Sequence, residues 1–311
     1  MKATLLQTAV QNSAKRIPMG LVVAAAVTFL HQNATAITTI DYGAASSFAI
    51  LAGTGISDAG GSSITGTALT GNVGLSPTTG FAITGLTHGQ VGGTIYTVDG
   101  LAPTLNTSDA GLLTTAKNAF GAANTAAAGQ SPTPPNLGLQ LGTQTLLPGV
   151  YTFDPGTVLL DGTLTLNGNG EAHPIWIFQA KSDLTTGSSS GIVFENGGIP
   201  CDVLWEVPTQ ATLGTDSTFV GTIMAGTSIV MDHGATLDGR AWAEAAVTLD
   251  DNIITGLPCT SLTDTGGTGG TTVPDTGSTL PLLGIGVLGL LALSRARGQS
   301  LVLTQNRRAI S

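Results

Sequence analysis

The chain has 311 residues and a formal net charge of −9, with 41% hydrophobic but only 9% charged residues. This balance excludes a disordered chain, which combines high charge with low hydrophobicity, and the abundance of Gly, Thr, Val, Ile and Leu favours short β-strands. Between Ile37 and Thr272 the basic residues are Lys117, Lys181 and Arg240. Because phosphate backbones attract basic surfaces, we expect no nucleic-acid partner.

The N-terminus has the layout of a secretory signal peptide. Lys2, Lys15 and Arg16 precede the apolar run 20–30, and "ATA" at 34–36 is a typical cleavage site. We therefore predict a signal peptide over residues 1–36, removed by signal peptidase after Ala36. The alternative is a retained membrane anchor, which the short apolar run disfavours.

The segments that follow predict strands and one helix. "SFAILAGTGIS" (47–57) and "SSITGTALTGNVGLSP" (62–77) alternate apolar with polar or small residues, as strands with one buried face do. Segment 107–128 instead predicts a long helix, with Thr107 or Ser108 as N-cap and an end at Gly129 and Pro132. Its narrow core face suits packing along a flat sheet, and it consists of Leu113, Ala116, Phe120 and Ala123.

Strand-like segments follow the predicted helix, and the last part of them contains a repeat of 18 residues. The pieces "GTLTLNG" (162–168), "PIWIFQA" (174–180), "SDLTTGSSSGIVF" (182–194) and "CDVLWEV" (201–207) lead into residues 218–252. There an offset of 18 places Phe219 on Leu237 and Ile229 on Val247, with His-Gly at 233–234 and Asp-Gly at 238–239 expected as turns. Units this short bury an apolar face only by stacking, which predicts an all-β β-solenoid.

The same offset brings charged residues together, so catalysis has to be considered. It places Asp232 on Asp250 at a turn, where carboxylates ordinarily cap backbone amides. The richest cluster is Asp232, His233, Asp238 and Arg240, followed by Glu244, Asp250 and Asp251. Glycoside hydrolysis needs two facing carboxylates. No H-E-x-x-H, Walker or C-x-x-C motif is present, and no G-x-S-x-G forms a nucleophile elbow between a strand and a helix. We predict no enzyme, no cofactor and no metal.

The two cysteines, Cys201 and Cys259, both lie in the exported part. An oxidising compartment favours a disulfide between them, and two free thiols are the alternative. The bond would connect the end of the domain to an earlier strand.

The C-terminus resembles the PEP-CTERM class of sorting signals. A Gly/Thr-rich linker (261–273) leads to a segment 274–298 with an apolar, transmembrane stretch (280–293) and a basic end, followed by a tail (299–311). Its motif is similar to the VPDSG variant and consists of Val273, Pro274, Asp275, Thr276 and Gly277. The resemblance implies cleavage by an exosortase-type membrane enzyme and a secreted or cell-surface protein, and a plain C-terminal anchor is the alternative.

Thr and Ser occupy many alternate strand positions. β-branched Thr suits solvent-facing strand positions in general. In stacked coils it would also form a flat lattice with ~4.8 Å between strands, which can order water. Met224 falls on Trp242 and Thr222 on Arg240 at the offset of 18, so we expect that row to lie away from any such lattice.

Residues 46–255 resemble the bacterial and fungal ice-binding proteins with the DUF3494 domain. The matching pieces include "LLTTAKNAFGAANTAA", "LLPGVYTFD", "PIWIFQAKSDLTTGSSSGIVFENGG" and "AVTLDDNIIT", in family order. The resemblance implies a right-handed β-solenoid of roughly triangular section over 37–260, with one long α-helix alongside, that binds ice through one flat face. Short T-(A/G)-x-(T/N) segments are associated with that face, and "TALT" (67–70) and "TGLT" (84–87) fit.

The expected function is therefore an exported antifreeze-like protein that inhibits ice growth and recrystallisation. Its partners would be ice and ordered water, and we expect a monomer. The alternative is a cell-surface structural or adhesive solenoid without ice activity. The candidate residues of the ice-binding face are Thr67, Thr70, Thr84, Thr87, Thr212, Thr218, Thr236 and Thr248.

Overall fold

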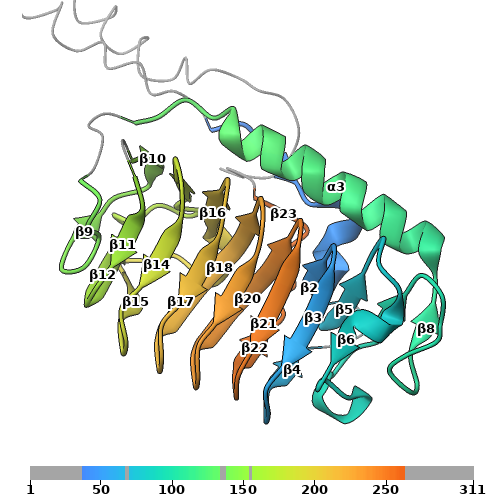
Figure 1. Cartoon of the computed structure of the whole chain (residues 1–311). Coiled ribbons are helices and arrows are strands. Elements are labelled where there is room, and N and C mark those ends of the chain that lie inside the picture. Colours follow the sequence, from blue (N-terminus) through green and yellow to red (C-terminus); the bar gives the residue numbers. More distant parts are fainter. Residues whose placement is uncertain (1–36, 67–69, 134–137, 154–155, 263–311) are drawn as a thin grey trace, which may run out of the picture. The chain divides into compact units, whose positions relative to one another are not determined.

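The computed structural model describes residues 37–262, apart from 67–69, 134–137 and 154–155 (Figure 1). The predicted signal peptide, the sorting signal and candidate Thr67 lie outside the described residues. Among those that are described, no helix has both the length and the apolar character needed to cross a bilayer.

The described chain winds into coils that stack through parallel pairing, as the sequence predicted. One row of strands lies under the helix and is called the helix-covered sheet; β18 and β20 enter it with their C-terminal halves. In stacking order its strands are β10 (Gly149–Thr152), β13 (Trp176–Gln179), β16 (Val203–Val207), β18 (Thr218–Ala225), β20 (Thr236–Ala243), β2 (Phe48–Ala52), β5 (Asn72–Leu75), β7 (Ile95–Thr97) and β8 (Thr107–Ser108).

The other two sides of the coils are also parallel β-structure. The second contains the N-terminal halves of β18 and β20, together with β9 (Thr145–Leu146), β12 (Thr163–Asn167), β15 (Gly191–Glu195), β22 (Ile253–Thr255) and β4 (Ser63–Thr65). The third is a seven-stranded sheet of β11 (Val158–Leu160), β14 (Leu184–Thr186), β17 (Ala211–Leu213), β19 (Ile229–Met231), β21 (Ala246–Leu249), β3 (Gly55–Asp58) and β6 (Ile83–Thr84).

Four short 3₁₀ turns and one antiparallel pair complete the described elements. The turns are η1 (Gly43–Ser47), η2 (Gly80–Ala82), η3 (His88–Gln90) and η4 (Pro200–Asp202). The pair joins β1 (Ile40–Asp41) to β23 (Ser261–Leu262), which brings the two ends of the described chain together.

The stacking order differs from the chain order, and the helix makes this possible. β2 inserts beside β20, so the first coils stack onto the last ones, and β5 and β7 follow outward. The chain must then return to the opposite end, where β10 begins the second set of coils. Helix α3 (Ala110–Ala128) makes this return along the helix-covered sheet (Figure 1). Its 19 residues span about 28 Å.

The helix is held by an apolar face and by capping groups. Its buried residues are Leu113, Ala116, Phe120, Ala123 and Ala127, which confirms the predicted stripe. The predicted N-cap was wrong: Asp109 caps the helix by accepting from the Leu112 amide at 2.8 Å, while Thr107 and Ser108 form β8. At the other end, the Gln179 amide donates to the Ala127 carbonyl at 2.8 Å.

The interior of the coils is a continuous apolar core that includes an aromatic stack. Trp205 lies against Phe178, with ring centroids 4.0 Å apart, and against Phe219 at 4.8 Å. All three are buried. Because successive coils contribute to this stack, the β-structure on the solvent side is attached to a closely packed, rigid interior.

Candidate functional site

Two rows of outward-facing side chains run along the second side of the coils, and we call this surface the two-row face. The first row is in register along its whole length. It consists of Thr163, Gly191, Thr218, Thr236, Ile253 and Ser63. The second row consists of Thr165, Val193, Val220, Asp238, Thr255 and Thr65.

The chemistry of the two-row face is uniform. Threonine or serine occupies seven of these twelve positions, and Val193, Val220 and Ile253 are aliphatic. Side chains repeat at ~4.8 Å between strands and at ~6.8 Å along each strand. Such a face presents methyl and hydroxyl groups on a two-dimensional lattice with few charges.

The residues between the two rows point inward and keep the lattice fixed. They are Leu164, Ile192, Phe219, Leu237, Ile254 and Ile64, and all are buried. Two hydroxyls of the face are also held by the backbone: Thr65 Oγ1 donates to the Ile254 carbonyl at 3.3 Å, and Thr236 Oγ1 lies 3.5 Å from the Ser217 carbonyl. The outward rotamers therefore lose little further freedom when the face meets a surface.

Asp238 is the one ionisable residue in the two rows. It lies between Val220 and Thr255 in the second row, and partial burial raises the pKa of its carboxyl. The prediction of a turn at Asp238-Gly239 was wrong, because both residues lie inside β20, where the chain passes from the two-row face to the helix-covered sheet. Gly239 packs there against the Gly221 backbone, which leaves no space for a Cβ.

The third side of the coils carries one continuous outward row and is called the one-row face. Its row is registered from end to end and consists of Leu159, Thr185, Thr212, Val230, Thr248, Ser57 and Thr84. Its central strands are three residues long with both ends turned inward, so each presents a single side chain. At its border, Asp183 accepts from Thr209 and Gln210, which lowers the pKa of its carboxyl.

The structure distributes the candidate threonines over both faces. Thr218 and Thr236 pair on the two-row face, whereas Thr84, Thr212 and Thr248 lie on the one-row face. Thr87 is the N-cap of η3, with its hydroxyl 2.7 Å from Gln90 Oε1, and Thr70 precedes β5 in a turn. The candidates therefore do not form one site.

Sequence reasoning did not align the other residues of the two-row face. The offset of 18 connects Thr218 to Thr236 and applies no further along this row. The register instead joins Thr163 to Gly191, 28 positions apart, and Thr236 to Ile253, 17 apart. The alternation "TLT" at 163–165 and "SIT" at 63–65 was visible in the sequence, but its position on the same face was not.

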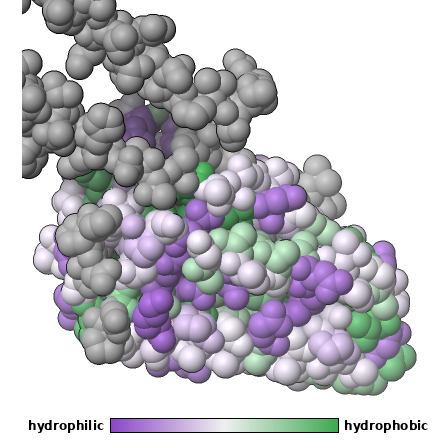
Figure 2. Space-filling model, turned by 90° about the horizontal axis from the view of Figure 1, so that it is seen from above, coloured by the Kyte–Doolittle hydropathy of each residue, from purple (hydrophilic) through white to green (hydrophobic). Residues whose placement is uncertain are grey.

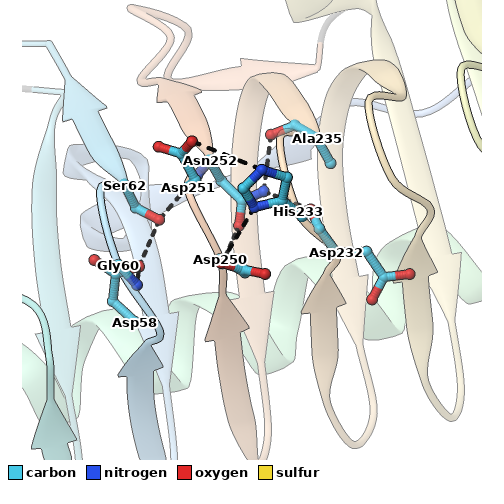
Figure 3. A network of polar contacts seen from close by, with 9 residues as sticks. All are labelled: Asp58, Gly60, Ser62, Asp232, His233, Ala235, Asp250, Asp251 and Asn252. Atoms are coloured by element: carbon cyan, nitrogen blue, oxygen red, sulfur yellow. Dashed lines mark hydrogen bonds and ion pairs between the residues drawn. The ribbon is translucent and has the colours of Figure 1, made fainter.

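The acidic cluster lies at the corner between the one-row and two-row faces (Figure 3). At its centre Asn252 is buried, and its side-chain amide donates to the carbonyls of Asp232 and Ala235 at 2.8 and 3.0 Å. Its side-chain oxygen, Oδ1, accepts from the backbone N–H of Asp250 at 2.7 Å. His233 lies on the solvent side, with Nδ1 3.4 Å from Asp250 Oδ1.

The second half of the corner is a capping arrangement around Asp58 (Figure 3). Asp58 Oδ1 accepts from the Ser62 hydroxyl at 2.7 Å and from the Gly60 amide at 3.2 Å. Ser62 Oγ in turn accepts from the backbone N–H of Asn252 at 2.9 Å. These groups close turns, and within the described residues no group of three His, Cys, Asp or Glu is arranged to hold a metal ion.

At this corner, glycine is required at the corresponding position of every second coil. Gly234 has φ +72°, and a Cβ there would lie 2.4 Å from Asp216 Oδ1 of the previous coil. Gly61 repeats the arrangement under Asp251 with φ +77°. Asp and Gly therefore alternate along this edge of the two-row face, because a left-handed backbone and a neighbouring carboxylate together exclude larger side chains.

The helix-covered sheet is closed to solvent. It contains the row that pairs Thr222 with Arg240 and Met224 with Trp242, so this row lies away from the two outward faces, as expected. Arg240 is fully buried, and burial lowers its pKa to about 10. From the side of α3 (Figure 2), hydrophilic, neutral and hydrophobic residues are interspersed over the coloured surface. This side therefore has no regular array.

The chain is similar to proteins named for ice binding. The family model described as Ice-binding-like matches residues 50–255, and the VPDSG-CTERM motif matches 272–297. An ice-binding protein of Nostoc sp. (strain HG1) is 37% identical over 257 residues, which cover 82% of this chain and 86% of that protein. One from Flavobacterium frigoris (strain PS1) is 37% identical over 218 residues, 70% of this chain and 76% of that protein.

Solved structures give the same result. The DUF3494 domain of Shewanella frigidimarina ice-binding protein 1 superposes with a TM-score of 0.62 at 28% identity, covering 71% of this chain and 98% of that chain. The ice-binding protein of the Antarctic ascomycete Antarctomyces psychrotrophicus has a TM-score of 0.58 at 36% identity, covering 71% and 99%.

Proposed function

Since this chain belongs to the ice-binding-like family, we propose that it is an exported ice-binding protein that adsorbs to ice through its two-row face. The observation that carries the choice of face is the double row of Thr, Ser and aliphatic side chains on six strands, whose first row is registered along its whole length. Adsorbed molecules would pin an advancing ice front and so inhibit ice growth and recrystallisation.

The physical basis is ordered water on a rigid, weakly polar surface. Methyl groups such as those of Thr218 and Thr236 restrict the adjoining water, and the hydroxyls anchor it at fixed spacing. Water held at a repeat of ~4.8 Å by ~6.8 Å can join the ice lattice with little loss of entropy. A flexible or charged surface would instead hold water in orientations set by its own groups.

The other two sides of the coils fit ice less well. The helix-covered sheet lies under α3. The one-row face has outward Thr residues, but a single row fixes water along one direction only, and the charged corners lie close on both sides of it. The two-row face has two fixed directions, and its rows carry Asp238 as their one charge. Glu195 lies beyond the second row at the end of β15, and the acidic corner lies along one edge of the face.

Export is supported by the VPDSG-CTERM motif at 272–297, which suggests an exported or cell-surface protein. Removal of residues 1–36 by signal peptidase and processing at Val273–Gly277 by an exosortase-type enzyme complete the proposal. We assign the chain no reaction, because its relatives are named for ice binding and its acidic corner is engaged in closing turns.

A pair of matched variants tests which face binds ice. Thr218→Tyr and Thr212→Tyr both place a ring on an outward strand position, the first on the two-row face and the second on the one-row face. We expect thermal hysteresis and recrystallisation inhibition to fall at least severalfold in Thr218→Tyr and to change little in Thr212→Tyr, with unchanged circular dichroism. The reverse order would assign ice binding to the one-row face.

A further inference from the structure

The two ends of the described chain leave the coils at the same place. β1 and β23 are antiparallel, with Ile40 opposite Leu262 and Asp41 opposite Ser261. In this register, the chain before Ile40 and the chain after Leu262 leave the pair on the same side. The C-terminal segment continues toward the sorting motif, so any pull from a surface anchor enters the domain at Leu262.

Residues Gly256–Leu262, which we call the strap, lie directly between this entry point and the two-row face. The strap follows β22, whose Ile253 and Thr255 belong to the two rows. Hydrogen bonds at successive points along the strap hold it to the rest of the domain. The Tyr42 amide donates to the Thr260 carbonyl at 3.0 Å, and the Gly256 amide donates to the Thr65 carbonyl at 3.0 Å.

Arg240 holds the middle of the strap from below. Its guanidinium donates through Nη2 to the carbonyls of Leu257, at 2.6 Å, and Cys259. The same nitrogen reaches the Ser46 carbonyl at 3.1 Å, and the Tyr42 and Trp242 rings lie 5.5 and 5.7 Å from the guanidinium carbon. A buried cation is thus used to fix backbone carbonyls of the strap.

A pull at Leu262 would load these bonds one at a time. The pair β1–β23 would open first, then the bonds to Thr260, Leu257 and Gly256. The next element is β22, bonded to β20 on one side and to β4 on the other. Release of β22 would remove a strand from the middle of the two-row face.

The disulfide interrupts this sequence. Cys259 is covalently joined to Cys201, with 5.8 Å between the Cα atoms. Cys201 lies in η4, immediately before β16, and β16 is bonded to β13 and to β18 with four registered pairs on each side. Beyond Thr260, a pull would therefore pass into the centre of the helix-covered sheet, and not into β22.

We propose that the strap and the Cys201–Cys259 disulfide form a tension-bearing attachment point, which keeps a pull from the cell-surface anchor away from the two-row face. The biological use rests on the proposed function, since tension arises when a surface-anchored protein adsorbs to ice. The mechanical claim does not involve ice. The covalent bond limits peeling to the last residues of the strap and leaves every strand of the two-row face in place.

Single-molecule force extension tests this proposal. The full chain carries one handle at its C-terminus and a second on a labelled Thr212→Cys, which lies on the one-row face outside the strap. The oxidised molecule is pulled, relaxed, treated with a thiol reductant and pulled again, so that it has folded before the bond is broken. A Cys201→Ser/Cys259→Ser chain, which lacks the disulfide without any reductant, provides a second comparison.

We expect an additional low-force extension of roughly 20 Å after reduction, since about six residues between Cys259 and Ile253 become free at ~3.4 Å each. The double-Ser variant should show it from the first pull. Equal extension before and after reduction would overturn the proposal, as would an oxidised molecule that already releases β22 at low force. Because no ice is present, neither outcome depends on whether the two-row face binds ice.

Discussion

Asn252→Ala is the substitution whose cost follows most directly from the structure. Asn252 is 1% exposed and lies immediately before β22. Its side chain makes three hydrogen bonds to backbone groups: two to the carbonyls of Asp232 and Ala235 and one from the Asp250 amide. Alanine would leave these three groups without that partner at the corner of the two-row face.

The expected loss is about 3–4.5 kcal/mol, at roughly 1–1.5 kcal/mol for each of the three hydrogen bonds. For a domain of this size 1 kcal/mol corresponds to about 2–4 °C, so the melting temperature should fall by about 10 °C. Urea denaturation and calorimetry measure both quantities. The control is Asn118→Ala on the exposed side of α3, which should change stability by no more than ~0.5 kcal/mol. A loss below 1 kcal/mol in Asn252→Ala would refute the assignment of this side chain as the support of the corner.

Three further predictions concern charge and backbone. Asp238→Asn should raise thermal hysteresis. The thermal hysteresis of the original protein should rise as pH falls through the raised pKa of Asp238, and that of the variant should not change with pH. Equal pH profiles would place this residue outside the area that contacts ice. Burial also raises the pKa of Glu206 above its ordinary 4.5, so the folded state binds the proton more tightly than the unfolded state, and the free energy of unfolding should increase as pH falls toward 4.5. Glu206→Gln should raise the melting temperature and lose this pH dependence. An unchanged pH dependence in the variant would contradict the role given to the Glu206 carboxyl. Gly121→Ala in α3, where a Cβ meets nothing within 4 Å, should stabilise the fold by about 0.5–1 kcal/mol. Gly234→Ala should destabilise it by at least ~1–2 kcal/mol, because Gly234 has φ +72° and its Cβ would clash with Asp216 Oδ1. Equal changes of the two variants in urea denaturation would contradict the argument that the backbone of Gly234 requires glycine.

The sequence predicted the repeated units correctly because their spacing is local and strict. The offset of 18 reproduces the observed pairing of β18 with β20 and of β19 with β21. The helix was predicted because its apolar residues recur on one side, and the disulfide because both cysteines lie in the exported part; both predictions are confirmed.

The insertion of β2 beside β20 was not predictable from local pattern. It depends on a pairing between residues about 190 positions apart, such as Ile50 and Ala241. The residue pattern of neither strand indicates which other strand it pairs with. The same limitation affected the two-row face. Its coils differ in length at the corners, so Thr163, Thr218 and Ser63 align only once the corner loops are known.

Two local predictions failed for a specific reason. Asp238-Gly239 has the composition of a turn, but the chain bends there within one strand, and Gly239 is required by the close approach of the Gly221 backbone. Thr107 and Ser108 were expected to cap the helix, but their pairing with β7 extends the sheet, so Asp109 is the first residue free to cap it.

Adsorption to growing ice is the most direct test of the central claim. The fluorescently labelled protein is placed around a single ice crystal that grows slowly, and its incorporation is compared with that of a Thr218→Tyr/Thr236→Tyr variant. We predict that the original protein enters the ice and that the variant, with its fold intact by circular dichroism, is excluded into the liquid. Exclusion of the original protein would contradict ice binding itself, and equal incorporation of both would contradict the assignment to the two-row face.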